Sequence, residues 1–255
     1  MKRKLTLILL AVAFLLIASV SAYQLYGILS EYKQGEEVYD DLSQHVTTPS
    51  PQPTPEDIVI DSPYADIVWP AVDFDALRAI NDDVVGWIYL DGTQINYPIV
   101  KGEDNEYDLN RLFDGKGNGS GSIFMDYRNA GDFTDRNNII YGHRMNNGSM
   151  FADVANYSNR TFFEENPHIL IITPEHRYVV EVFSAHTADV VHNAWDLSFD
   201  GDDRYVAWLE DIKSRSYFDR EVELNADTRV VTLSTCTYEF ENARFVVHGI
   251  IHEVE

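Results

Sequence analysis

Three residue types in this sequence are those that acyl transfer by a thiol needs. The single cysteine, Cys236, lies in the segment Thr-Leu-Ser-Thr-Cys-Thr-Tyr at 232–238, and Arg244 follows eight residues later. His143 ends the segment Tyr-Gly-His, which closes an apolar run. A thiolate is the nucleophile of cysteine enzymes, an imidazole moves protons, and a guanidinium keeps its proton and stabilises an oxyanion. The set predicts Cys236 as nucleophile, His143 as acid–base group and Arg244 as the oxyanion partner.

Each of these residues also has an ordinary structural interpretation. Free cysteine is among the most often buried residue types, so Cys236 could be a small core hydrophobe. His143 could be a core histidine bonded to a carbonyl, and Arg244 could form a surface ion pair with Glu239 or Glu241. The sequence alone does not bring the three residues together in space.

The segments that must position these residues predict a mainly β fold. Helices are expected over 74–81, with Asp73 as N-cap, and over 203–214, where apolar residues recur at helical spacing. The expected strands are 85–90, 95–100, 122–125, 138–141, 168–173, 178–185, 230–234 and 245–254. Many short strands with few helices between them favour a closed β-barrel with helical insertions. His143 and Cys236 then lie at strand ends, where scaffolds commonly present active-site groups.

The N-terminus has the features of a membrane anchor. Lys2-Arg3-Lys4 precedes an uncharged stretch, 5–30, that is long enough to cross a bilayer as a helix. The basic start predicts a cytoplasmic N-terminus and an extracellular body. A signal peptide cleaved near Val20-Ser21-Ala22 is the alternative, but the apolar run continues past that point and favours a retained anchor.

Composition divides the rest of the chain. We expect an anchor over 1–30, an acidic and Pro-rich extracellular linker over 31–68, and a catalytic domain over 69–255. The Pro-rich core of the linker, Thr-Thr-Pro-Ser-Pro-Gln-Pro-Thr-Pro at 47–55, favours an extended stalk rather than a packed element.

Charge and cysteine content exclude some classes of protein. The chain has 19 basic and 42 acidic side chains, a formal charge of −23, which argues against a nucleic-acid partner. One cysteine excludes an intramolecular disulfide. No segment predicts a cofactor or a metal: His248 and His252 have the spacing of helical zinc ligands, but they lie in a strand pattern.

The order and spacing of these motifs resemble the sortase family, and class B sortases most closely. The resemblance covers roughly 70–255. Besides the motifs around His143 and Cys236, it is carried by Ile-Asn-Tyr-Pro-Ile-Val at 95–100, Asp-Asn-Glu-Tyr-Asp-Leu at 104–109, Gly-Ser-Ile-Phe-Met-Asp-Tyr-Arg at 121–128 and Ser-Met-Phe at 149–151. The sequence departs from the pattern at Thr237, where some class B members carry an acidic residue.

The resemblance implies an eight-stranded sortase barrel on the outer face of a Gram-positive-type membrane. It implies a transpeptidase that cleaves a sorting signal containing Pro and Thr after the Thr. The surface protein is then held as a Cys236 thioester and passed to an amine of a peptidoglycan precursor. His143, Cys236 and Arg244 match the family's catalytic positions. The residues matching its substrate groove are Asn105, Leu109, Tyr141, Ser234 and Thr235.

Other functions stay open at this point. A pilin-polymerising sortase would use a lysine acceptor. A papain-like hydrolase has its Cys before its His along the chain, the reverse of the order here. An L,D-transpeptidase would carry a His-Gly-Cys cluster, which this sequence lacks. A membrane-tethered binding module with a buried Cys236 would have no catalysis at all.

Overall fold

The computed structural model describes residues 2–47, 63–64, 66–189, 193–236 and 243–254. The side chains of Lys2 and Cys236 are outside this description. Residues 48–62, which include all but the first residue of the expected Pro-rich stalk at 47–55, lie outside the described residues, as do Thr237, Glu239 and Glu241.

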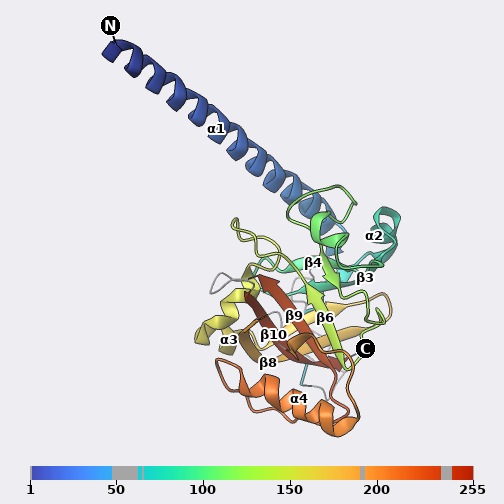
Figure 1. Ribbon diagram of the computed structural model, residues 1–255. Coiled ribbons are helices and arrows are strands. Elements are labelled where there is room, and N and C mark those ends of the chain that lie inside the picture. Colours follow the sequence, from blue (N-terminus) through green and yellow to red (C-terminus); the bar gives the residue numbers. More distant parts are fainter. Residues whose placement is uncertain (1, 48–62, 65, 190–192, 237–242, 255) are drawn as a thin grey trace.

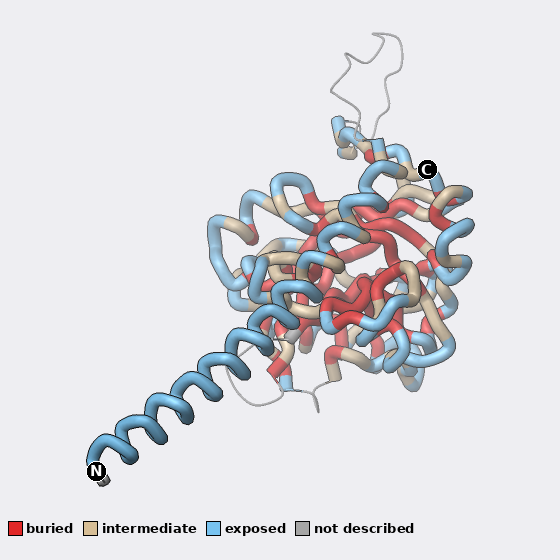
Figure 2. Tube along the Cα trace, turned by 90° about the horizontal axis from the view of Figure 1, so that it is seen from above, coloured by how far each residue is buried: buried red, intermediate tan, exposed pale blue. Residues whose placement is uncertain are grey.

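One long helix, α1 (Lys2–Ser43), projects from a globular body (Figures 1 and 2). Its N-terminal part is exposed along the whole apolar stretch, and an 18-residue window reaches a mean hydropathy of 2.7 with none of it buried. About 20 apolar residues span a bilayer as a helix, so α1 is suited to membrane anchoring. Its last turns belong to the body, since Leu42 is buried there.

The body is a closed barrel of eight strands, which confirms the expected fold. The strands are β3 (Val84–Tyr89), β4 (Asn96–Val100), β5 (Ile123–Met125), β6 (Asn137–Tyr141), β7 (His168–Ile172), β8 (Arg177–Asp189), β9 (Val230–Cys236) and β10 (Ala243–Glu253). Their order around the barrel is β10-β8-β7-β3-β4-β5-β6-β9. The pairs β4–β5 and β6–β9 are parallel, and the other described pairings are antiparallel.

Short elements connect the strands. They are β1 (Val46–Thr47), β2 (Ala71–Val72), α2 (Phe74–Ile80), η1 (Asp108–Asn110), η2 (Asp153–Ser158), α3 (Arg160–Glu165), η3 (Asn193–Trp195) and α4 (Asp202–Ser214). Both expected helices are present, as α2 and α4. Asp73 caps α2 as expected, because its Oδ1 accepts a hydrogen bond of 3.0 Å from the amide of Ala76.

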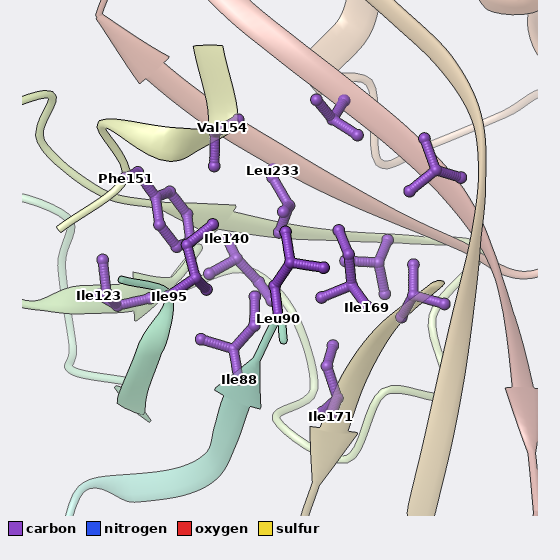
Figure 3. Close-up of a cluster of buried hydrophobic side chains, with 14 of the residues drawn as sticks. Ile88, Leu90, Ile95, Ile123, Ile140, Phe151, Val154, Ile169, Ile171 and Leu233 are labelled. Carbon is purple, nitrogen blue, oxygen red and sulfur yellow. The ribbon is translucent and has the colours of Figure 1, made fainter. Parts of the chain in front are cut away.

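Apolar side chains fill the barrel and also cover parts of its outside. Alternate residues of the strands point inward, among them Ile88, Ile140 and Leu233, and meet Phe151 from a connecting segment (Figure 3). A second cluster around Trp87 packs the outer face against α2 and the end of α1, and a third lies beneath α4. Because the interior is packed with side chains, any site must be built at the ends or on the outer face of the strands.

Candidate active site

Two parallel neighbours, β6 and β9, end at the same edge of the barrel. Tyr141 is the register partner of Ser234, and the amide of Gly142 donates a hydrogen bond of 3.2 Å to the Ser234 carbonyl. His143 follows the end of β6, and Cys236 is the last residue of β9. The two candidate residues, far apart in sequence, therefore leave neighbouring strands in the same direction.

The antiparallel partner of β9 supplies the third candidate. Arg244 of β10 is the register partner of Cys236. Directly opposed residues of an antiparallel pair project from the same face of the sheet. Arg244 is half-buried, and its Nη1 donates to the carbonyl of the preceding Ala243 at 3.1 Å. The topology thus brings the three predicted catalytic positions to one end of the adjacent strands β6, β9 and β10.

The imidazole of His143 is held by a backbone carbonyl. Its Nε2 lies 2.7 Å from the carbonyl oxygen of Leu109 in η1. A carbonyl oxygen can only accept, so Nε2 carries the hydrogen and donates it. In the neutral ring Nδ1 is then the basic nitrogen.

Gly121 allows this arrangement. Its φ is +61°, in the left-handed region, and a Cβ there would lie 2.5 Å from the Leu109 oxygen and 3.0 Å from Cδ2 of His143. Only glycine lets the chain pass this close to the ring and to the carbonyl that orients it. The close approach explains a glycine at 121 before the strand β5.

A buried carboxylate organises two of the predicted groove residues. Asp126 is 0% exposed; it accepts hydrogen bonds from Asn105 Nδ2 (3.2 Å) and from the hydroxyl of Tyr141 (3.0 Å). Arg128 binds it through Nε (2.8 Å), Nη2 (2.7 Å) and its amide (3.0 Å). Burial by itself would raise the pKa of Asp126, but the hydrogen bonds from Arg128 and Tyr141 outweigh it and lower that pKa. Asp126 is therefore an ionised residue that fixes Asn105 and Tyr141 relative to each other.

The remaining predicted groove residues are placed differently. Leu109 is 37% exposed beside the His143 ring. Ser234 is buried and its Oγ accepts a hydrogen bond of 3.2 Å from Nε1 of Trp195 in η3. Thr235 is buried on the opposite face of β9, in register with the core residue Phe245, so it faces the barrel interior.

Sequence reasoning did not assign a role to Asp126, Gly121 or Trp195. Asp126 and Arg128 lie in the segment 121–128. An acidic and a basic residue two positions apart at a strand end could have indicated an ion pair there. Gly121 and Trp195 act through contacts between distant segments, for which the sequence offers no local signal.

Comparisons with known proteins identify the fold. Residues 88–251 match the model of the Sortase domain family. The chain belongs to the sortase family. It is 35% identical to Sortase B of Listeria monocytogenes over 175 residues, which are 68% of this chain and 71% of that protein. It is 31% identical to Sortase B of Staphylococcus aureus over an alignment of 256 positions, which covers 100% of this chain and 99% of that protein.

Solved sortase B structures are similar in fold to this sortase. A sortase B–substrate complex from Staphylococcus aureus has a TM-score of 0.68 at 34% identity, and covers 71% of this chain and 85% of that one. Sortase B from Bacillus anthracis in complex with AAEK1 has a TM-score of 0.73 at 33% identity, and covers 89% of this chain and 100% of that one. Sortases are cysteine transpeptidases that anchor proteins to the cell wall, so membership gives this sortase its broad class.

Proposed function

We propose that this sortase joins surface proteins to the cell wall through a thioester on Cys236. It cleaves a C-terminal sorting signal containing Pro and Thr after the Thr, and transfers the new C-terminus to an amine of a lipid-linked peptidoglycan precursor. The strand register is the observation that supports this proposal most. Cys236 is opposite Arg244, and its strand β9 ends beside β6, the strand that leads to His143. The proposed reaction uses no cofactor.

The chemistry runs in two balanced halves. With the thiol proton moved to Nδ1 of His143, the Cys236 thiolate attacks the Thr carbonyl carbon, and Arg244 stabilises the oxyanion of the tetrahedral intermediate. The C–N bond then breaks, and His143 gives a proton to the departing amine. In the second half an acceptor amine attacks the thioester, His143 takes its proton, and the Cys236 thiolate leaves. Because Nε2 is bound to Leu109, we assign these proton transfers to Nδ1.

The groove for the sorting signal is proposed along the outer face beside these residues. Asn105 and Tyr141, held by Asp126, form one part of it, and the exposed Leu109 lies beside His143. A sortase B of Staphylococcus aureus has been solved as a substrate complex, which supports a substrate groove on this fold. Ser234 and Thr235 are proposed to shape the groove from β9, Ser234 at its wall and Thr235 from beneath.

The proposed topology is a single-pass membrane protein. The anchor 1–30 crosses the membrane with its N-terminus in the cytoplasm, the linker 31–68 follows, and the catalytic domain 69–255 works outside. The exposed apolar half of α1 and the basic residues before it support this topology.

The test uses the full chain in detergent micelles with a panel of fluorogenic sorting peptides. Acceptors are a peptidoglycan stem peptide with a free amine and, separately, a lysine-bearing pilin peptide. We expect cleavage after Thr and a product joined to the stem-peptide amine, and Cys236→Ala should abolish both. Tyr89→Phe, which removes a surface hydroxyl bonded to Asp91, is the matched control and should keep full activity. Equal turnover by Cys236→Ala would refute the thioester mechanism, and transfer to the lysine peptide alone would refute the wall acceptor.

A further inference from the structure

The last turns of α1 contact the loop that precedes β5. The side chain of Asn118 donates to the carbonyl of Glu31 at 2.9 Å, and Gly35 lies against Ser120, whose Oγ would be 3.2 Å from a Cβ at position 35. One turn further along, the hydroxyl of Tyr39 donates to the carbonyl of Gly121 at 2.7 Å. Helix α1 therefore contacts the 118–121 loop at Asn118, Ser120 and Gly121.

The same turns also contact the segment that follows His143. Asn147 Nδ2 donates to Oε1 of Glu36 at 3.0 Å. The ring of Tyr39 packs edge-to-face on Tyr97, with centroids 5.2 Å apart, and the Tyr97 hydroxyl accepts a hydrogen bond of 3.0 Å from the amide of Met150. The next amide, that of Phe151, donates to the carbonyl of His143 at 2.9 Å.

Both segments that α1 binds are those that fix His143. Gly121 lies against the ring and against the Leu109 carbonyl that orients it, and residues 144–151 close a loop on the backbone of His143. Tyr39 contacts Gly121 through its hydroxyl and Tyr97 through its ring, and so is connected to both of these segments. Its side chain is half-buried against the body, and burial raises its pKa well above the usual value, so it is a neutral donor.

We propose that the juxtamembrane turns of α1 are a positioning element of the active site, in which Tyr39 holds the ring of His143 in its Nε2–H, Leu109-bound orientation through Gly121 and Tyr97. The part of the inference that concerns catalysis rests on the proposed role of His143. The segment 31–43, expected from composition to belong to a linker, is in this proposal a part of the catalytic unit. Since α1 is one helix from Lys2 to Ser43, the membrane anchor and the His143 loops form a continuous structure.

The decisive experiment compares Tyr39→Phe and Tyr39→Ala with the unchanged full chain in detergent micelles. Histidine-selective ¹⁵N labelling reports which nitrogen of the His143 ring carries the hydrogen, and His143→Gln assigns its signals. The unchanged chain should show protonated Nε2 in the neutral ring. Tyr39→Phe should show a mixture of the two tautomers and a shifted His143 limb in the pH profile of kcat. It should lose about three- to tenfold in kcat, the cost of one hydrogen bond, with little change in KM.

The control is Tyr205→Phe, which removes a buried hydroxyl of helix α4 that is bonded to the carbonyls of Arg136 and Thr228. It should lower stability as Tyr39→Phe does, without altering the His143 tautomer or the pH profile. The proposal is overturned if Tyr39→Phe and Tyr39→Ala fold and retain the ring signals of the unchanged chain. Because the tautomer is measured without substrate, this outcome differs from a failure of the proposed transpeptidation, which would appear as absent cleavage by the unchanged chain.

Discussion

Position 121 tolerates only the hydrogen side chain of glycine, because a Cβ there would clash with neighbouring atoms. The Cβ of Gly121→Ala would lie 2.5 Å from the Leu109 oxygen and 3.0 Å from the His143 ring, in a backbone conformation that disfavours side chains. Backbone atoms cannot move aside as a flexible side chain can, so the Leu109–His143 hydrogen bond must break or the loop must shift. We expect a loss of about 1–3 kcal/mol in stability and at least a tenfold fall in kcat.

Gly148→Ala is the matched control for that substitution. Gly148 also has a positive φ, +87°, but no atom lies within 4 Å of a Cβ there. Gly148→Ala should lose stability because alanine disfavours a positive φ, but its kcat should not fall. Equal kcat values for the two variants, measured with the cleaved sorting peptide, would contradict the steric role assigned to Gly121.

Asp126 makes a pH-dependent contribution to the free energy of unfolding. Its pKa is lowered in the folded chain, so the ionised form stabilises the fold above the unfolded pKa of about 4, and this contribution is lost as pH falls through the folded pKa. Asp126→Asn leaves Arg128 without its partner, and we expect a loss of about 1–3 kcal/mol at pH 7. Urea unfolding of the full chain in micelles should show this difference shrinking below pH 4. A difference that stays constant from pH 7 to pH 3 would contradict the assignment.

At the scale of elements, the strands that form the barrel are predictable and the short connections are not. The apolar runs at 138–141 and 230–234 give β6 and β9 nearly to the residue, and Asp73 marks the start of α2. By contrast, the paired β1 and β2 have two residues each, and η1 has three, too few for a periodic pattern. The exact placement of His143 depends on η1, so the identity of the catalytic candidates was predictable while the orientation of the imidazole was not.

The element η1 also contains a destabilising charge. Asp108 is buried, and its Oδ2 has no hydrogen-bond partner among the described residues. Burial, with Asp83 and Asp104 nearby, raises its pKa to about 6. The unfolded carboxyl ionises near pH 4, so folding becomes less favourable as pH rises from about 4 to about 6 and stays so above.

Asp108→Asn removes this charge and should stabilise the chain. We expect a gain of about 2 kcal/mol at pH 7.5 that vanishes below pH 4, where the carboxyl is protonated in both states. Urea unfolding at the two pH values measures it, with the exposed Asp75→Asn as control, for which no gain is expected. A variant that is less stable than the unchanged chain at pH 7.5 would show that the Asp108 carboxylate is needed in its ionised form.

At the scale of the whole molecule, the sequence indicates an anchor and a barrel but not how they are joined. The apolar run and the basic start are visible in the composition, because membrane insertion depends on local hydropathy. The packing of residues 31–43 on the barrel depends instead on contacts of Tyr39 and Glu36 with residues about 60 to 110 positions away. Such contacts produce no periodic pattern in the sequence. For this reason the segment was expected, from its composition, to belong to a linker.

The single cysteine makes the proposed topology directly measurable. If the catalytic domain lies outside the membrane with its thiol accessible, a membrane-impermeant maleimide added to intact cells should label Cys236, and Cys236→Ser should remain unlabelled. Labelling only after the membrane is permeabilised would place the barrel in the cytoplasm and contradict the proposed orientation. Absence of labelling even in the solubilised native protein would contradict an accessible thiol, and with it the role of Cys236 as nucleophile. One reagent therefore tests both the orientation that α1 imposes and the exposure that the thioester chemistry requires.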